Sequence, residues 1–285
     1  MTQEAIDALE IRPDGRYLDG TLGGGTHTKE ILKASSPNGR VISLDVDHAA
    51  LERAKMTLAE YANRWTGVEG NFRHLDQYAE EQGMMPLDGI LLDLGFSSDE
   101  LEDPSKGLSF MQDGPLDMRL GPKANDDGMT AAEIVNTWTE ADIEKMLRVF
   151  GEEPYARRIA KGICEARKAA RIIGTLDLVS VIRKSVPNSP SRIHPATRTF
   201  QALRIAVNDE LESLKVAIVS AHRALAPGGI LAIISFHSLE DRIVKNAFAS
   251  GDWQAKIKKP ILPSDEEVSS NPRSRSAKLR IAKKV

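Results

Sequence analysis

The sequence of 285 residues contains one cysteine, Cys164, and few aromatic side chains, which make up 5% of the chain. A single cysteine excludes an internal disulfide framework and a cysteine-rich zinc site. No apolar run reaches the roughly 18 residues that suggest a membrane-spanning helix. Residues 1–10 lack the basic start and apolar core of a signal peptide. We therefore expect a cytoplasmic protein with no membrane partner. Cys164 lies in a helical pattern, and we expect its side chain to pack against the protein core.

Several chemical signatures are missing as well. The six histidines show no i, i+4 pairing, so the sequence gives no signature of a metal site. No G-x-S-x-G motif is present, which argues against a hydrolase built on a nucleophile elbow. We expect no metal.

The formal net charge is only −3, which taken whole argues against a nucleic-acid partner, but the charge is unevenly distributed. Residues 76–154 carry 5 basic and 19 acidic side chains, whereas residues 155–205 carry 11 basic and 2 acidic ones. A basic cluster of this kind attracts phosphate. A solvated helix face that pairs with the acidic segment is the alternative interpretation. The basic side chains are Arg157, Arg158, Lys161, Arg167, Lys168, Arg171, Arg183, Lys184, Arg192, Arg198 and Arg204.

Apolar strand-like runs alternate with helical patterns at both ends of the chain. We predict strands at 16–19, 40–45, 65–72, 87–93 and 230–236, a weak strand at 278–282, and helices at 28–34, 48–62, 209–225 and 238–249. Asp47 is the expected N-cap of the second helix, and Ser238 with Asp241 fits a capping box. This alternation predicts a mostly parallel sheet with helices on both faces.

The alternation stops in the middle of the chain. Helical patterns cover residues 130–149, 155–170 and 176–186, with turns at 113–115 and 187–190 and few strand signals. We therefore predict a Rossmann-like α/β domain formed by residues 1–104 and 206–285. A helical domain of residues 105–205 is inserted into it.

The strongest local signal is the segment 19–27, DGTLGGGTH, which follows a strand and precedes a helix. Glycines there let the backbone approach a ligand closely. Asp45 ends the next strand, where a carboxylate can bind both ribose hydroxyls of an adenosine. Asp19, directly before the loop, suits the ammonium and sulfonium groups of S-adenosylmethionine. A nicotinamide dinucleotide is the alternative, disfavoured by the missing third glycine after Gly25, and a plain strand–turn–helix junction is another.

The fourth predicted strand ends at Asp93. Ligands of open parallel sheets bind beyond the carboxyl ends of the strands. Asp19, Asp45 and Asp93 are therefore expected to lie along one edge of the sheet, around the same pocket.

Five segments carry a resemblance to a known family: 19–27 (DGTLGGGTH), 88–95 (DGILLDLG), 107–119 (GLSFMQDGPLDMR), 194–204 (HPATRTFQALR) and 235–242 (SFHSLEDR). Together they resemble the RsmH (MraW) family of bacterial ribosomal RNA methyltransferases over nearly the whole chain. The resemblance implies a class I S-adenosylmethionine-dependent methyltransferase fold with an inserted helical domain. It also implies methyl transfer to the exocyclic N4 of a cytosine in the decoding region, the P site, of 16S ribosomal RNA.

By this resemblance, the cofactor contacts fall on Gly25, Thr26, His27, Asp45, Phe72, Asp93 and Glu100. The position of Glu100 is commonly glutamine in the family, and an ionised carboxylate there accepts a hydrogen bond but cannot donate one. Family members usually carry an additional N-terminal segment. We therefore expect that the start of this chain is truncated and that the missing segment caps the cofactor pocket.

The expected reaction needs an acceptor for the amine hydrogens of cytosine, because the amine lone pair is delocalised into the ring and must be oriented towards the methyl group. Asp93 is the best candidate, with Ser97 and Ser98 as helpers. His237 follows the fifth strand at the same edge, either as an active-site residue or as a residue of the rim. Phe96 either stacks on the base or packs in the core.

The expected macromolecular partner is 16S ribosomal RNA or the small ribosomal subunit, contacted by His194 and Arg198 of the basic stretch. A catalytically idle RNA-binding or assembly factor with the same fold is the alternative function, and an NAD-dependent oxidoreductase is a less favoured one. The inserted helices also offer a surface for pairing with a second copy, so a homodimer is left open.

Overall fold

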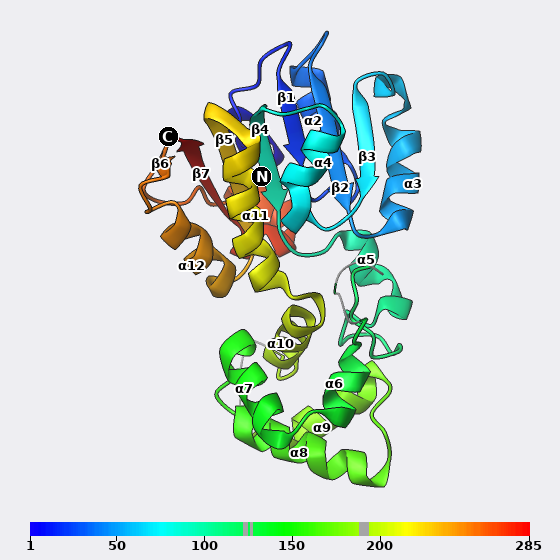
Figure 1. The fold of residues 1–285 in the computed structure, drawn as a ribbon. Helices are drawn as coiled ribbons and strands as arrows, with labels where there is room; N and C mark the ends of the chain where they lie inside the picture. Colours follow the sequence, from blue (N-terminus) through cyan, green and yellow to red (C-terminus); the bar gives the residue numbers. More distant parts are fainter. Residues whose placement is uncertain (122–124, 126–127, 188–193) are drawn as a thin grey trace. The chain divides into compact units, whose positions relative to one another are not determined.

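The computed structural model describes residues 1–121, 125, 128–187 and 194–285. The chain divides into two compact units, which Figure 1 shows. We call Met1–Gly95 with Leu211–Val285 the sheet unit, and Phe96–Glu210 the helical unit. The boundaries expected from the sequence lay at 104/105 and 205/206. In the part of the chain that the structure describes, no helix combines the length and apolar character needed to cross a bilayer.

The sheet unit is built on seven strands in the order β3-β2-β1-β4-β5-β7-β6. The five strands from β3 to β5 are parallel, whereas β7 is antiparallel to β5 and β6 is antiparallel to β7. The predicted mostly parallel α/β fold is thus confirmed. The strands are β1 (Arg16–Asp19), β2 (Arg40–Asp45), β3 (Trp65–Glu69), β4 (Leu87–Asp93), β5 (Leu225–Ser235), β6 (Trp253–Ala255) and β7 (Lys278–Lys284).

Helices cover both faces of this sheet because its strands are apolar on both sides. Leu18 and Ile90 enter one apolar cluster, whereas their neighbours Tyr17 and Leu91 enter another. Figure 1 shows α4 and α11 in front of the sheet. The helices are α1 (Thr2–Ala8), α2 (Thr26–Ala34), α3 (His48–Thr57), α4 (Leu75–Glu81), α11 (Glu210–Ala224), α12 (Ser238–Ala247) and α13 (Asp265–Ser270), with 3-10 turns at Ala59–Tyr61, Phe72–His74 and Pro272–Ser276.

The strand predictions agree with the structure at β1, β2 and β4. They differ at β3 and β5, β7 continues two residues beyond its predicted end, and β6 was not predicted. β3 ends at Glu69, three residues earlier than predicted, because Asn71 caps a 3-10 turn by accepting a hydrogen bond from the Arg73 N–H (3.1 Å). β5 begins at Leu225, five residues before the predicted start at 230, and therefore includes residues 226–229. The pairing of β5 with β4 shifts register between Leu87 and Gly89, so these residues form a bulge.

The helical unit has its own apolar core. Its helices are α5 (Ser98–Glu102), α6 (Ala131–Thr137), α7 (Glu140–Gly151), α8 (Ala156–Ala169), α9 (Thr175–Ser185) and α10 (Thr197–Asn208), with a 3-10 turn at Pro104–Lys106. The helix predicted at 130–149 is two helices, because the Thr139 side chain caps a new helix by accepting from the Asp142 N–H (3.2 Å). Residues 188–190 of the predicted turn and Arg192 lie outside the described residues.

One amide holds the segment 107–120 onto the end of α10. Asn208 is 4% exposed. Its Oδ1 accepts from the Leu120 N–H (2.9 Å), and its Nδ2 donates to the carbonyl oxygens of Met118 (2.8 Å) and Arg204 (2.9 Å). The side chain thus satisfies polar backbone groups of two segments at once.

We expect Asn208→Ala to lower the free energy of unfolding by about 2–3 kcal/mol, because buried backbone groups lose their partners. Urea unfolding measures the change, with Asn246→Ala on the exposed side of α12 as the matched control. The control should stay within about 0.5 kcal/mol of the parent chain. Equal stability of the two variants would contradict the role given to Asn208.

Candidate active site

Three carboxylates lie along one edge of the sheet, as the sequence predicts. Asp19, Asp45 and Asp93 are the last residues of β1, β2 and β4, which are neighbouring parallel strands. Parallel strands bring their carboxyl ends to the same edge. β5 extends the row, because Asp93 is in register with Ile234, shortly before the end of that strand. The edge therefore collects polar side chains from four successive strands.

Asp19 is fully buried and its carboxylate holds the loop in place. Its Oδ1 accepts from the Thr21 N–H (3.1 Å), and its Oδ2 accepts from the Thr28 hydroxyl (2.7 Å). The Thr28 hydroxyl also lies 2.7 Å from the Ser43 Oγ on β2. Local hydrogen bonds within the protein engage both oxygens of this carboxylate, and the expected role of Asp19 towards the charged groups of a cofactor stays a prediction.

The glycine loop adopts a conformation that side chains disfavour. Gly23 has a φ of 48° and Gly25 a φ of 78°, in the left-handed region. Gly25 is the N-cap of α2, which places Thr26, exposed, and His27, half-buried, in the first helical turn. A Cβ on Gly24 would meet no described atom within 4 Å, so a ligand can approach the backbone there.

Asp45 ties the loop to the end of β2. Its Oδ2 accepts from the Gly23 N–H (2.8 Å), and its Oδ1 accepts from the Asp47 N–H (2.8 Å). Each carboxylate oxygen has more than one lone pair and can accept from more than one donor. Phe72 lies beside the start of the same loop, since a Cβ on Gly20 would be 3.3 Å from the Phe72 Cβ.

Asp93 has a buried carboxylate oxygen that could accept a hydrogen bond from a ligand. Its N–H donates to the Thr21 hydroxyl (2.7 Å), and its Oδ2 lies 3.6 Å from the His27 Nδ1. Its Oδ1 is buried and has no hydrogen-bond partner among the described residues. Burial raises the pKa of Asp93 to about 6. The His27 ring opposes this rise, whereas the charges of Asp19 and Glu240 add to it.

His237 is the N-cap of α12, and its ring sits against Glu240. The His237 Nδ1 accepts from the Glu240 N–H (3.4 Å), while the Glu240 Oε1 lies 3.2 Å from the His237 Nε2. Glu240 is 3% exposed, and its Oε2 accepts from the N–H groups of Phe236 (2.8 Å) and His237 (3.3 Å). Glu240 was not identified from the sequence, although its place three residues after His237 fits a capping box.

The predicted capping box of Ser238 and Asp241 is wrong by one position. Ser238 is the first residue of α12, and the cap is formed by its neighbour together with Glu240. Asp241 instead accepts from Lys278 Nζ (3.0 Å) and Arg280 Nε (2.6 Å) on β7. This pairing draws the Asp241 carboxylate away from the helix terminus.

Ser97 and Glu100 meet in the helical unit as the N-terminal cap of α5. The Ser97 hydroxyl donates to the Glu100 Oε2 (3.0 Å) and accepts from the Glu100 N–H (3.2 Å). The Glu100 Oε1 lies 3.7 Å from Lys106 Nζ. Ser98 is the first residue of the helix. The capping box accounts for the observed hydrogen bonds between Ser97 and Glu100. The contacts expected of these two residues with a cofactor or substrate stay predictions.

Phe96 packs against the core of the helical unit, with the Arg204 guanidinium 4.8 Å from its ring centroid. Arg204 also forms a two-bonded ion pair with Glu210, at 2.6 and 2.8 Å. The core interpretation of Phe96 is therefore the one observed. Arg204 is engaged inside the unit, so it is removed from the set of phosphate-binding side chains.

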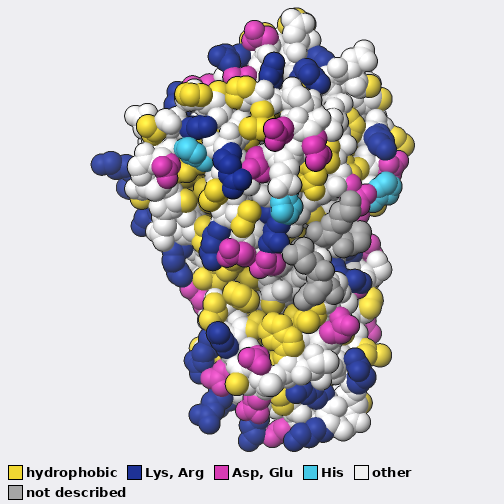
Figure 2. All heavy atoms as spheres, viewed as in Figure 1, with side chains coloured by type: hydrophobic (Ala, Val, Ile, Leu, Met, Phe, Trp, Pro, Cys, Tyr) yellow, Lys and Arg dark blue, Asp and Glu magenta, His cyan; other side chains and the backbone are white. Residues whose placement is uncertain are grey.

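The basic stretch has an outward part and an inward part. Arg157, Arg158 and Lys168 of α8 are exposed and have no carboxylate partner among the described residues. Figure 2 shows Lys and Arg spheres gathered around the end of the helical unit where α8 lies in Figure 1. Arg167 instead points inward and donates to the carbonyl oxygens of Val135 and Trp138, both at 2.8 Å. The described residues therefore give no support to the interpretation that Arg157, Arg158 and Lys168 pair with the acidic segment 76–154.

Comparison with known proteins gives one consistent result. The model of the MraW methylase family matches residues 1–285. The chain is 46% identical to "Ribosomal RNA small subunit methyltransferase H" of Heliobacterium mobile and 44% identical to the protein of that name in Clostridioides difficile, covering 100% of this chain and 97% of each relative. It is also similar to the crystal structure of a putative rRNA methylase from Clostridium thermocellum (13% identity, TM-score 0.48, covering 99% of this chain and 96% of that one).

The raised pKa of Asp93 predicts a pH-dependent stability. The pKa is about 6 in the folded chain and about 3.9 in an unfolded chain. The folded state therefore binds the proton more tightly, and stability falls as the pH rises from about 4 through 6. We expect Asp93→Asn to be more stable than the parent chain by about 1–2 kcal/mol at neutral pH. The difference should shrink towards pH 4.

Urea unfolding at pH 4.5 and pH 7.5 measures this difference, with Asp252→Asn as an exposed control. The control should show little change between the two pH values. A stability difference for Asp93→Asn that is the same at both would mean that Asp93 has an ordinary pKa.

Proposed function

The chain belongs to the MraW methylase family, and from this premise we propose that it methylates the exocyclic N4 of a cytosine in the decoding region, the P site, of 16S ribosomal RNA. The methyl donor is S-adenosylmethionine. The observation that supports the proposal best is the buried Oδ1 of Asp93, which has no hydrogen-bond partner among the described residues and lies beside an open glycine loop at the carboxyl edge of the sheet. An acceptor in this place suits an amine that must be oriented for attack.

The residues around the loop fit the cofactor. Bound S-adenosylmethionine would supply a methyl group already activated by its sulfonium. Asp45, at the end of β2 beside the loop, would accept hydrogen bonds from the ribose hydroxyls. Gly25, Thr26 and His27 would approach the ligand along the open loop, and Phe72 would lie by the adenine. Glu100 is the remaining residue that we propose for the cofactor contacts.

We assign Asp93 the role of proton acceptor. Its Oδ1 would accept a hydrogen bond from the N4 amine, which orients the nitrogen lone pair and stabilises the positive charge that grows on nitrogen. When the new N–C bond has formed, the nitrogen must lose one proton. With a pKa of about 6, Asp93 is mostly ionised at pH 7 and can take this proton before releasing it to water. His27, 3.6 Å from Oδ2, would hold the carboxylate in place.

The remaining site residues would act on the substrate. We propose Ser97 and Ser98 as helpers that bind the base, and His237 as a residue of the active-site rim, held by Glu240. The exposed cations of α8 would bind RNA phosphates, so the helical unit would recognise the RNA. His194 and Arg198 belong to the same proposed contact surface. Such a protein would act in the cytoplasm, where its substrate is.

The direct test of this function is a methylation assay with tritium-labelled S-adenosylmethionine, comparing naked 16S ribosomal RNA with small ribosomal subunits. We expect label on one cytosine of the decoding region, mapped to N4 by nucleoside analysis. Label on another nucleotide would reject the proposed site. Cofactor binding without transfer to either substrate would instead support an idle assembly factor.

The test of the proposed chemistry is Asp93→Ala, measured as single-turnover methyl transfer at saturating cofactor. We expect a loss of at least about 100-fold, comparable to removing one preorganised electrostatic group. In the parent enzyme the rate should rise with pH through about 6 as Asp93 ionises. Asp252→Ala, which removes an exposed carboxylate, is the matched control. Near-normal turnover by Asp93→Ala would remove Asp93 from the mechanism.

A further inference from the structure

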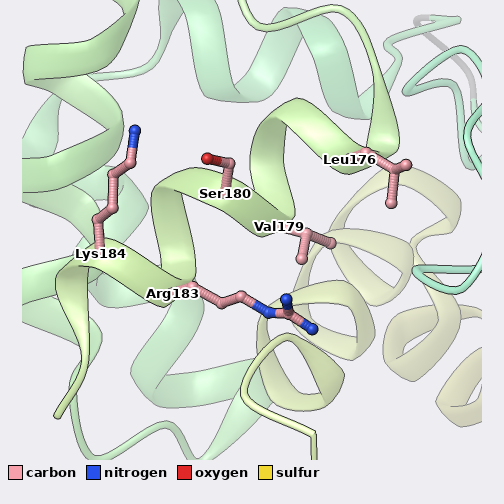
Figure 3. A pocket seen from close by; sticks show the side chains of 5 residues that line it. All are labelled: Leu176, Val179, Ser180, Arg183 and Lys184. Carbon is pink, nitrogen blue, oxygen red and sulfur yellow. The ribbon is translucent and has the colours of Figure 1, made fainter. Parts of the chain in front are cut away.

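One face of α9 forms a groove with a volume of about 430 Å³. Leu176, Val179, Ser180, Arg183 and Lys184 line this groove, and their spacing places them on one side of the helix. The first two are apolar, whereas the last two are cations. Figure 3 shows that the Arg183 and Lys184 side chains extend in different directions from the same end of the helix.

Neither cation of the groove is neutralised by a carboxylate among the described residues. Arg183 instead faces a histidine, since its Nη2 lies 2.9 Å from the His194 Nε2. A surface arginine usually gains more from an acid or from water than from an imidazole, which carries no negative charge. The positive charge at this end of α9 is therefore available to an anion.

The His194 ring is held in a fixed plane. It stacks on Phe110 with the ring centroids 4.7 Å apart and the planes within 5°. Phe110 in turn packs edge-on against Phe200 of α10 at 5.5 Å. On its other side, the Nδ1 of His194 accepts a hydrogen bond from the Ala196 N–H (3.2 Å). These contacts fix which nitrogen faces Arg183.

The His194 ring cannot offer an acceptor to both N–H groups that face it, those of Arg183 and Ala196. Because Nδ1 accepts from Ala196, a neutral His194 ring carries its proton on Nε2. The Nε2–H then points at an N–H of Arg183, and two donors face each other. The other tautomer gives Arg183 an acceptor but sets the Nδ1–H against the Ala196 N–H. Protonating both nitrogens adds a second positive charge beside Arg183. In each protonation state a donor lacks an acceptor.

We propose that Arg183 and His194 form a binding site for one backbone phosphate of the RNA substrate. A phosphate oxygen is an acceptor that both facing donors can share, through the Arg183 Nη2–H and the His194 Nε2–H. Lys184 and the Ser180 hydroxyl line the same groove but point away from the Arg183 guanidinium (Figure 3), so they would contact a neighbouring phosphate. Leu176 and Val179 would contact the sugar. This site rests on the proposed function, because it takes the RNA of that reaction.

One further observation favours RNA as the source of the phosphate, and a second agrees with the binding of an anion. The exposed cations Arg157, Arg158 and Lys168 lie on α8, which packs closely against α9: a Cβ on Gly162 would lie 2.2 Å from the Ser185 Oγ. Several cations on adjacent helices suit a chain of phosphates better than a single small anion. Burial, with the charge of Arg183, also lowers the pKa of His194. The free ring is therefore neutral at pH 7, and a bound anion would raise this pKa again.

The test is the salt dependence of binding to small-subunit RNA by three variants. Arg183→Ala should weaken binding about tenfold at low salt and reduce the slope of log affinity against log salt by about 0.7–1. His194→Phe keeps the stack on Phe110 but removes the Nε2 donor, so we expect a loss of about threefold to tenfold. The matched control is Arg148→Ala, which removes a cation of the same unit already paired with Glu144 (2.7 Å). Its slope should stay that of the parent chain.

A second readout separates binding from a structural effect. Nitrogen-15 NMR of the histidine rings should show the His194 pKa rising when RNA is added, which a packing role alone would not produce. An unchanged pKa, or the same salt slope for Arg183→Ala and Arg148→Ala, would overturn the phosphate site. Methyl transfer by the parent enzyme would leave the proposed function standing in that case. Failure of the parent enzyme to bind or methylate the RNA would reject the function itself.

Discussion

The buried carboxylate of Asp19 is the interaction on which the candidate active site depends. It accepts hydrogen bonds from Thr21 and Thr28, so it fixes both ends of the glycine loop to the end of β1. The Thr21 hydroxyl then accepts from the Asp93 N–H, and Thr28 reaches Ser43 on β2. One buried carboxylate thus positions the loop relative to the end of β4 and to β2. The residues expected to contact the cofactor or the substrate, Asp45 and Asp93, are held by the loop that Asp19 fixes.

The helical unit is organised by segments that are distant in the sequence but meet around α9. The Thr175 hydroxyl at the start of α9 donates to the Gln112 carbonyl (2.7 Å), while Arg183 near its end faces His194. Phe110 joins the two regions by stacking on His194. The packing that builds the unit therefore also fixes the proposed phosphate site. Side chains of the basic stretch divide between this core and the outer surface.

The sequence predicted the strand ends well, because an apolar run bounded by an acidic residue is a local pattern: Asp19, Asp45 and Asp93 end their strands as expected. Helix termini were harder. His237 is an unusual N-cap, so the sequence pattern favoured Ser238. The helix α10 was missed because its buried residues include the polar Thr199 and Asn208, which interrupt the apolar pattern. The pairing of Arg204 with Glu210 and the burial of the Asp93 Oδ1 depend on tertiary contacts that no local pattern contains.

We propose that the carboxyl edge of the sheet binds S-adenosylmethionine through Asp45. The decisive measurement is calorimetric titration of the cofactor into Asp45→Ala and into Asp47→Asn. Asp47 is the nearby N-cap of α3, where asparagine also caps well. We predict that Asp45→Ala weakens binding by at least about tenfold, because charged hydrogen bonds are lost, while Asp47→Asn binds like the parent chain. Equal affinity of both variants would contradict it.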